Sequence, residues 1–352
     1  MTVLTRARAR RAALAIPAAA AALALALTGC SGSADPAEST ADASFGDASI
    51  QLSWIKNVEF AGQYMAEENG YFAEAGFDSV DLVAGPGATE SLVATGSATI
   101  GITDPISAAP AIINEGAPIK IIGTTYQKNP FTILSLADAG NIATPEDLIG
   151  KRIGVQAGNE TLFEALLAAN DIDSADVTIV PVEYDPSVLI TGDVDGFLAY
   201  ITNESIIIES QGYEVTNLTY ADNGLPFVTE SVIASQDTID NQPELLEGLL
   251  YALIKGWQDA LADPQAATDL TMSLYGDELG LDADVQYKQA VEAAGLIESV
   301  DTDANGLFTM TDALIAENLA VLASVGTDIT ADQLFDFSLL ENVYANHPEL
   351  IG

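Results

Sequence analysis

Residues 49–85 read SIQLSWIKNVEFAGQYMAEENGYFAEAGFDSVDLVAG, and this stretch decides the fold class. The run at 49–54 predicts a strand, and the run at 60–69 predicts a helix that ends at Gly70. The run at 81–85 predicts a second strand. A strand, a helix and a strand in so short a stretch indicate a βαβ unit with parallel strands.

The same alternation continues along the chain. Thr144 and Pro145 fit the cap and the first position of a short helix that ends at Gly150. Apolar residues recur at helical spacing between Leu245 and Trp257, which predicts a core-facing helix in a helical C-terminal third. We expect further strands at 98–104, 118–126, 132–137, 151–157, 177–182, 194–200 and 231–236, and further helices at 106–115, 160–169, 186–190 and 203–211.

These elements predict an α/β fold with two lobes. We assign residues 48–132 and 232–352 to lobe 1 and residues 133–231 to lobe 2, because the strand at 231–236 could return the chain to the first lobe. Two such lobes joined by crossing strands bind a small molecule in the cleft between them, at the carboxyl ends of the strands.

The composition excludes several function classes. The 352 residues include 52 acidic and 11 basic side chains, one His and one Cys, and the formal net charge is −41. A chain this acidic is not expected to bind nucleic acid or an anionic membrane surface. One Cys excludes a disulfide framework, and a single His, His347, excludes a His/Cys metal cluster. We therefore expect no metal and no cofactor.

The N-terminal residues have the pattern of an export signal. Four Arg between positions 6 and 11 precede an Ala/Leu-rich stretch at 12–27, and Leu27-Thr-Gly-Cys30 resembles the bacterial lipobox. Residues 1–29 would then be a lipoprotein signal peptide, Cys30 the lipidation site and residues 30–47 a disordered acidic tether. Removing residues 1–29 would leave seven basic residues and a net charge of −45. An ordinary secretory signal with an incidental Cys is the alternative.

The run from Trp54 to Phe77, WIKNVEFAGQYMAEENGYFAEAGF, resembles the opening of substrate-binding proteins of ABC importers in the thiamine-pyrimidine, alkanesulfonate and nitrate family. The runs GSATIG at 96–101, TPEDLIGKRIGV at 144–155 and GDVDG at 192–196 are similar to further family motifs. The resemblance covers roughly residues 50–325. It implies a periplasmic-binding-protein type II fold, a lipid-anchored extracytoplasmic location, an ABC permease and ATPase as partners, a monomer and no enzymatic activity.

Within this family, Trp54, Asn57 and the pair Asn203-Glu204 look most like the branch that binds precursors of thiamine and riboflavin. A flat heteroaromatic ring needs an aromatic face to stack on and polar groups at its rim. The expected ligand-binding residues lie at strand ends or in the loops after them: Trp54, Asn57, Glu59, Phe60, Tyr64, Asp104, Tyr126, Gln127, Gln156, Asn159, Tyr184, Tyr200, Asn203 and Glu204. For any single aromatic residue, packing in the core is the alternative.

The scarcity of Arg narrows the ligand class. Sulfonate, nitrate, phosphate and carboxylate groups are usually held by Arg or by helix N-termini. Beyond residue 29 the one Arg is Arg152, at the start of an expected strand and so away from the expected cleft. A neutral or cationic ligand that donates hydrogen bonds, such as an aminopyrimidine, is therefore the first prediction. Riboflavin and then alkanesulfonate or taurine are the alternatives.

Three other readings stay open at this point. The run from Asp301 to Asp312 has the spacing of a Ca²⁺ loop, although it equally fits an Asn-Gly turn before a helix capped by Thr309 or Thr311. The family's fold also occurs in cytosolic pyrimidine-synthesis enzymes, which are expected to use His and a Cys-rich segment. A purely structural or adhesive lipoprotein is the third class.

Overall fold

The computed structural model describes residues 44–351. The expected signal peptide, the expected lipidation site Cys30 and most of the expected tether lie outside the described residues. Among residues 44–351 no helix combines the length and apolar character needed to cross a bilayer.

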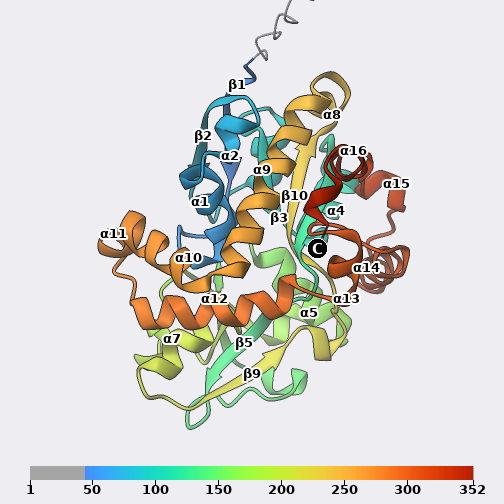
Figure 1. The fold of residues 1–352 in the computed structure, drawn as a ribbon. Coiled ribbons are helices and arrows are strands. Elements are labelled where there is room, and N and C mark those ends of the chain that lie inside the picture. Colours follow the sequence, from blue (N-terminus) through green and yellow to red (C-terminus); the bar gives the residue numbers. More distant parts are fainter. Residues whose placement is uncertain (1–43, 352) are drawn as a thin grey trace, which may run out of the picture. The chain divides into compact units, whose positions relative to one another are not determined.

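Two five-stranded mixed sheets organise the described chain (Figure 1). Sheet A has the order β2-β1-β3-β10-β4, and sheet B has the order β7-β6-β8-β5-β9. The strands of sheet A are β1 (Gly46–Gln51), β2 (Phe77–Val83), β3 (Ile100–Thr103), β4 (Ile119–Tyr126) and β10 (Thr229–Ser235). The strands of sheet B are β5 (Phe131–Leu136), β6 (Arg152–Gln156), β7 (Thr178–Val182), β8 (Gly196–Tyr200) and β9 (Val215–Thr219).

Each sheet combines parallel pairs with one reversed strand. In sheet A, β1 pairs in parallel with β2 and β3, while β10 runs antiparallel to β3 and β4. In sheet B, β6 pairs in parallel with β7 and β8, while β5 runs antiparallel to β8 and β9. The predicted βαβ alternation is therefore present in both sheets.

Helices fill the connections and form the C-terminal third. Up to β10 they are η1 (Val58–Phe60), α1 (Ala61–Glu68), α2 (Tyr71–Glu74), α3 (Thr89–Ala94), α4 (Pro105–Glu115), η2 (Pro145–Leu148), α5 (Glu160–Ala169), η3 (Ser174–Asp176), α6 (Ser187–Ile190), α7 (Glu204–Ser210) and η4 (Ala221–Asn223). After β10 they are α8 (Gln236–Asn241), α9 (Pro243–Ala262), α10 (Pro264–Thr271), η5 (Met272–Gly276), α11 (Asp277–Leu279), α12 (Ala283–Ile297), α13 (Val300–Asn305), α14 (Asp312–Ser324), α15 (Ala331–Leu334), α16 (Ser338–Asn346) and η6 (Pro348–Leu350).

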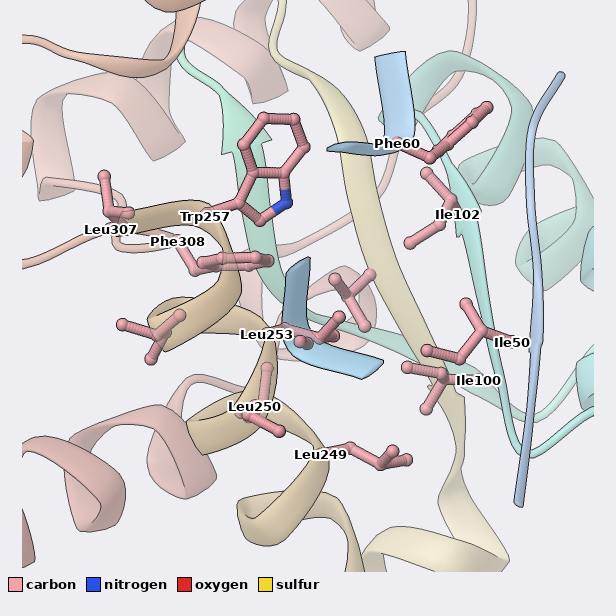
Figure 2. Packing of buried hydrophobic residues seen from close by; sticks show 14 of the residues in the cluster. Ile50, Phe60, Ile100, Ile102, Leu249, Leu250, Leu253, Trp257, Leu307 and Phe308 are labelled. Atoms are coloured by element: carbon pink, nitrogen blue, oxygen red, sulfur yellow. The ribbon is translucent and has the colours of Figure 1, made fainter. Parts of the chain in front are cut away.

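Helix α9 supplies much of the core against sheet A. The predicted stripe from Leu245 to Trp257 is buried, and Figure 2 shows Trp257 and Leu253 packed beside Phe308. Helices α1 and α9 cross in close contact, because a Cβ added at Gly62 would overlap the Trp257 indole ring. Close-packed burial of this kind is the main source of the fold's stability.

Three local expectations need correction. The first strand begins at Gly46, inside the expected tether, because Phe45 already donates its N–H to Gly76 O at 2.8 Å and its ring lies 5.2 Å from that of Phe77. The strand expected at 81–85 lies at 77–83. The edge strand β9 was not predicted, because only Leu218 among its residues is fully buried and its alternation is weak.

The segment with calcium-loop spacing is not an open loop. Residues 300–305 form helix α13, capped by Ser299, and Thr311 caps α14 through a 3.3 Å bond to the Leu314 N–H. Among residues 44–351 no group of three or more His, Cys, Asp or Glu side chains is placed to hold a metal ion.

Candidate functional site

A pocket opens where the carboxyl ends of the parallel strands of both sheets meet. It encloses about 680 Å³ of empty space, part of which is continuous with bulk solvent. The lining residues come from both sheets and from the loops that follow their strands: Ser53, Trp54, Glu59, Pro86, Gly87, Thr89, Glu90, Ile102, Thr103, Asp104, Ser107, Phe131, Gln156, Ala157, Gly158, Asn159, Leu198, Ala199, Tyr200, Asn203, Glu204 and Glu230.

The loops after the strands place the polar groups. Strand β3 leads to Asp104, which caps α4 by accepting from the N–H groups of Ile106 at 2.8 Å and Ser107 at 3.0 Å. Pro105 fits the first helical position, where its missing N–H is not needed. Strand β6 leads to Gln156 and then to α5, and strand β8 leads to Tyr200 and then to α7. Strand–helix turns therefore converge on the pocket, as the sequence pattern implied.

Five carboxyl groups line the pocket, and none of its lining residues is Lys, Arg or His. Burial raises the pKa of Asp104, Glu204 and Glu230 to about 7 in each case. Burial, and then the neighbouring charge of Glu230, raise the pKa of Glu59 well above its usual value. A pocket of this kind accepts hydrogen bonds and favours positive charge in its occupant.

Glu230 is the central acceptor of this group. Its Oε2 accepts from the Ser53 hydroxyl at 2.9 Å, and its Oε1 accepts from the Tyr200 hydroxyl at 3.0 Å. It also shares a hydrogen bond with the carboxyl of Glu59, which raises the pKa of Glu59. Because an ionised carboxylate can only accept, one of these two groups holds the proton in that bond.

The aromatic wall of the pocket includes Trp54 and Tyr200. Trp54 is 9 % exposed and lies in the loop after β1. Tyr200 ends β8, and its ring meets that of Phe131 edge to face at a centroid distance of 4.5 Å. These rings give a flat ligand apolar surface beside the acidic groups.

Eight of the residues predicted from the sequence line this pocket. They are Trp54, Glu59, Asp104, Gln156, Asn159, Tyr200, Asn203 and Glu204. Asn57 and Tyr126 instead line a smaller adjoining cavity, together with Glu59 and Asn203. In that cavity's wall, Asn57 caps η1 by accepting from the Glu59 N–H at 3.1 Å.

Four predicted residues lie outside both cavities. Phe60 and Tyr64 are core residues: Figure 2 shows Phe60 close to Ile102, and the Tyr64 ring lies 5.1 Å from that of Tyr275. Gln127 is held by carbonyl oxygens of Thr124 and Thr309. Tyr184 is 41 % exposed, because it follows β7, the edge strand of sheet B.

Sequence reasoning missed Ser53, Glu90 and Glu230. Glu230 lies in β10, just before the strand expected at 231–236. In that position, nothing in the sequence indicates that its carboxylate faces a pocket. Its φ of +50° is a conformation that non-glycine residues rarely adopt, and no sequence pattern indicates it. Glu90 lies in the first turn of α3 and accepts a hydrogen bond from the Thr103 hydroxyl.

Arg152 lies away from the pocket, as expected. Its guanidinium pairs with Asp195 at 2.8 Å on the surface, at the start of β6. The single His, His347, is also absent from the pocket lining: its ring lies 4.5 Å from that of Tyr251, tilted by 46°, near the C-terminus. Neither residue can contact a molecule bound at the strand ends.

Comparison with known proteins decides the family. Residues 57–267 match the model of the NMT1/THI5-like family. This chain belongs to the NMT1/THI5-like family. The matched segment begins at Asn57 and includes every predicted ligand-binding residue except Trp54. The resemblance read from the run at 54–77 is thereby confirmed.

Two curated relatives of this NMT1/THI5-like chain are solute-binding proteins. The riboflavin-binding protein RibY of Chloroflexus aurantiacus is 29% identical over 233 residues, which are 63% of this chain and 65% of that protein. The formylaminopyrimidine-binding protein of Halalkalibacterium halodurans is 25% identical over 232 residues, which are 64% of this chain and 69% of that protein. The match thus spans about two thirds of each relative's length.

Solved structures show the fold of this family member. The periplasmic aliphatic sulphonate binding protein SsuA of Escherichia coli aligns with a TM-score of 0.59 and 14% identity, over 80% of this chain and 91% of that one. The desulfurization enzyme DSZB aligns with a TM-score of 0.55 and 17% identity, over 85% of this chain and 99% of that one. The two-lobed periplasmic-binding-protein fold is confirmed, and DSZB indicates that this fold is compatible with both binding and catalysis.

Proposed function

We propose that this protein is the extracytoplasmic solute-binding component of an ABC importer, and that it binds a small heteroaromatic ligand rich in hydrogen-bond donors between its two sheets. A thiamine-type aminopyrimidine is the ligand class we favour. The observation that carries the proposal is the pocket at the strand ends, where five carboxyl groups and Trp54 line a space without Lys, Arg or His among its lining residues.

The chemistry of the pocket selects the ligand class. A ligand that offers N–H donors or positive charge supplies hydrogen-bond partners for the buried carboxyl groups. A flat ring in the same ligand can stack on Trp54. An anionic sulfonate would instead enter a pocket lined by five carboxyl groups, with no Lys, Arg or His among the lining residues to balance its charge. Like charges in a poorly solvated site repel strongly, which argues against sulfonate, nitrate or phosphate as the ligand.

Two relatives support this choice and give a second candidate. The formylaminopyrimidine-binding protein is named for a ligand of the favoured class. RibY, with 29% identity, favours riboflavin as the second candidate. The flavin pyrimidinedione edge presents one N–H donor between two carbonyl oxygens, and an ionised carboxylate can pair with the donor but not with the two acceptors. The aminopyrimidine therefore fits the described lining better.

We further propose that the protein performs no covalent chemistry. A nucleophile activated by His would need an imidazole in the pocket, and His347 lies elsewhere. Closure of the lobes around the ligand would present the loaded protein to a membrane permease driven by an ATPase. The protein would act as a monomer. We place the lobe crossings between β4 and β5 and just before β10, close to the boundaries expected from the sequence.

Anchoring through Cys30 completes the proposal. Residues 1–29 would be removed and the Cys30 thiol lipidated, which would hold the protein at the outer face of the membrane. Replacing Cys30 by Ser should release the protein into the medium or periplasm. Continued membrane attachment of that variant would refute the anchor without affecting the binding proposal.

A fluorescence titration tests the ligand proposal. The described chain has two Trp: Trp54 in the pocket and Trp257 in the core. Titration with 4-amino-5-hydroxymethyl-2-methylpyrimidine should quench Trp54 saturably, and riboflavin and taurine serve as comparison ligands. Trp54→Ala lacks the reporting indole, so its affinity is measured by titration calorimetry; it should bind at least tenfold more weakly, an effect of about 1.4 kcal/mol. The control Tyr184→Ala, on the exposed edge, should bind like the wild type. Equal affinity of the Trp54 variant and the wild type would remove Trp54 from the site.

A further inference from the structure

Two buried glutamines of α12 connect the loop before α1 with the pocket carboxylate Glu204. Gln286 and Gln289 lie one helical turn apart and are 2 % and 3 % exposed. Helix α12 contacts η1 on one side and α7 on the other, and Figure 1 shows it running between α10 and α7. Buried amides are costly unless each of their polar atoms is paired, so their partners indicate what they do.

The hydrogen bonds form one continuous chain. Gln286 Oε1 accepts from the Val58 N–H at 2.8 Å, and Gln286 Nε2 donates to Gln289 Oε1 at 2.7 Å. Gln289 Nε2 donates to Asn203 Oδ1 at 2.6 Å and to the Asn203 carbonyl oxygen at 3.3 Å. Asn203 Nδ2 then donates to Glu204 Oε1 at 3.1 Å.

The donor-to-acceptor direction of this hydrogen-bond chain is fixed by the groups at its two ends. A backbone N–H such as that of Val58 can only donate, so it requires the oxygen of Gln286 and leaves the NH₂ group for Gln289. The same logic passes through Gln289 and orients the amide of Asn203. An ionised carboxylate can only accept, so Glu204 fits the far end, and its Oε2 accepts from the Tyr200 N–H at 2.9 Å.

We infer that Gln286 and Gln289 are positioning residues, which orient Asn203 so that its NH₂ group holds the Glu204 carboxylate in the ligand pocket. This inference rests on the proposed function, because it treats Glu204 as a ligand-binding group. The hydrogen-bond chain starts at Val58 in η1, which follows β1 of sheet A, and ends at Glu204, which follows β8 of sheet B. Glu204 is therefore aligned only while the two sheets keep this arrangement.

Exchanging Glu and Gln between positions 204 and 289 tests the donor-to-acceptor direction of this hydrogen-bond chain, and it requires no ligand. In Glu204→Gln, the new NH₂ group faces the NH₂ group of Asn203, or else the Tyr200 N–H. In Gln289→Glu, the ionised carboxylate can no longer donate to Asn203 Oδ1. The double variant E204Q/Q289E reverses the far end of the hydrogen-bond chain: the carboxylate at 289 accepts from Gln286 and Asn203, and the amide at 204 donates to Asn203. The longer bond from position 289 to the Asn203 carbonyl oxygen is not restored. Its net charge equals that of the wild type.

Thermal unfolding of the full chain at pH 8 is the first measurement. Gln289→Glu should lower the thermal midpoint by about 3–6 °C, because it places an unpaired carboxylate beside Asn203 in a buried site. Glu204→Gln loses a hydrogen bond but also removes the burial cost that raises the pKa of Glu204, so its midpoint should fall less than that of Gln289→Glu. The double variant should recover at least half of the loss caused by Gln289→Glu. Gln242→Glu, at the exposed N-terminal end of α9 where the side chain makes no capping hydrogen bond, is the control for adding a carboxylate to a helix, and it should change the midpoint by less than about 1 °C.

Affinity for 4-amino-5-hydroxymethyl-2-methylpyrimidine is the second measurement. Both single variants should bind at least tenfold more weakly, and the double variant should stay weak, because its carboxylate has left the pocket. Recovered stability without recovered affinity is the result expected of positioning residues. Additive midpoint changes in the double variant, or a Gln289→Glu variant that matches the wild type, would overturn the inference. Failure of the wild type to bind the pyrimidine would contradict the proposed function alone, since the midpoints test the chain separately.

Discussion

The Tyr200 hydroxyl lies 3.0 Å from Oε1 of Glu230, so one hydrogen bond joins sheet B to sheet A at the wall of the pocket. Glu230 is 4 % exposed and adopts a φ of +50°, a conformation that costs a non-glycine residue on the order of 1–3 kcal/mol. Strain of this kind persists where surrounding contacts hold it, and such positions gather at binding sites. The Tyr200 and Ser53 bonds are contacts that hold Glu230 here.

Removal of the Tyr200 hydroxyl should loosen this junction. Tyr200→Phe deletes one buried hydrogen bond to a carboxyl group, so we expect it to lower the free energy of unfolding by about 1–3 kcal/mol and to weaken pyrimidine binding. Chemical denaturation and titration calorimetry measure the two effects.

Tyr220→Phe is the matched control for that variant. Tyr220 is also buried beside Phe131, but its hydroxyl has no hydrogen-bond partner among residues 44–351. Loss of this hydroxyl should leave the free energy of unfolding unchanged or raise it slightly. Equal destabilisation by both substitutions would show that the Tyr200–Glu230 bond does not stabilise the fold.

The raised pKa of Glu230 predicts a dependence of stability on pH. Burial moves its pKa from about 4.5 in the unfolded chain to about 7 in the folded protein, so the folded state holds a proton that the unfolded state releases. This contribution to stability is present below about pH 4.5 and is lost as the pH rises through 7. Glu230→Gln cannot ionise, so it avoids this loss as the pH rises. Its free energy of unfolding should therefore increase relative to that of the wild type between pH 5 and pH 8, by up to roughly 3 kcal/mol.

Denaturation curves of both proteins across that pH range measure the gain. Repulsion among the many surface carboxylates acts on both proteins alike, so it cancels in the difference. Parallel stability profiles of the variant and the wild type would contradict an elevated pKa at Glu230.

The sequence predicted the architecture well and the site in part. The βαβ periodicity and the stripe on α9 identify the layers, because burial imposes a regular spacing on apolar residues. Tyr184 and Tyr200 illustrate the limit. Both lie at the carboxyl ends of strands, yet Tyr184 follows the edge strand β7, whereas Tyr200 ends the central strand β8. Strand order depends on pairing between distant segments, and the residues of a single strand do not encode it.

Buried polar residues were the second feature of the site that the sequence did not reveal. Gln286 and Gln289 lie on a helix where polar residues are normally solvated, so nothing in their spacing distinguishes them from surface residues. Glu230 lies at the start of an apolar strand, where its environment comes from Ser53 and Tyr200, both distant in sequence. Such groups become recognisable only when the fold brings their partners together.

Alanine substitution should have opposite effects on stability at two glycines, one in the close crossing of α1 and α9 and one on the open side of α12. Gly62→Ala would place its methyl group in the Trp257 ring and should destabilise the protein by about 1–3 kcal/mol. Gly295→Ala on α12 meets open space and should raise the stability by up to about 1 kcal/mol through its better helix propensity. Thermal unfolding followed by circular dichroism distinguishes the two. Equal tolerance at both positions would mean that the helices are less closely packed than described.

The central claim is that the acidic pocket selects its ligand by the hydrogen bonds that the ligand donates. Titration calorimetry at pH 8 with 4-amino-5-hydroxymethyl-2-methylpyrimidine, and with the isosteric ring that carries a 4-methyl group in place of the 4-amino group, measures this selection directly. The account predicts micromolar or tighter binding of the aminopyrimidine and at least about 100-fold weaker binding of the methyl analogue, because the analogue leaves buried carboxylates unpaired. Equal affinity for both rings, or tighter binding of taurine than of either, would contradict it.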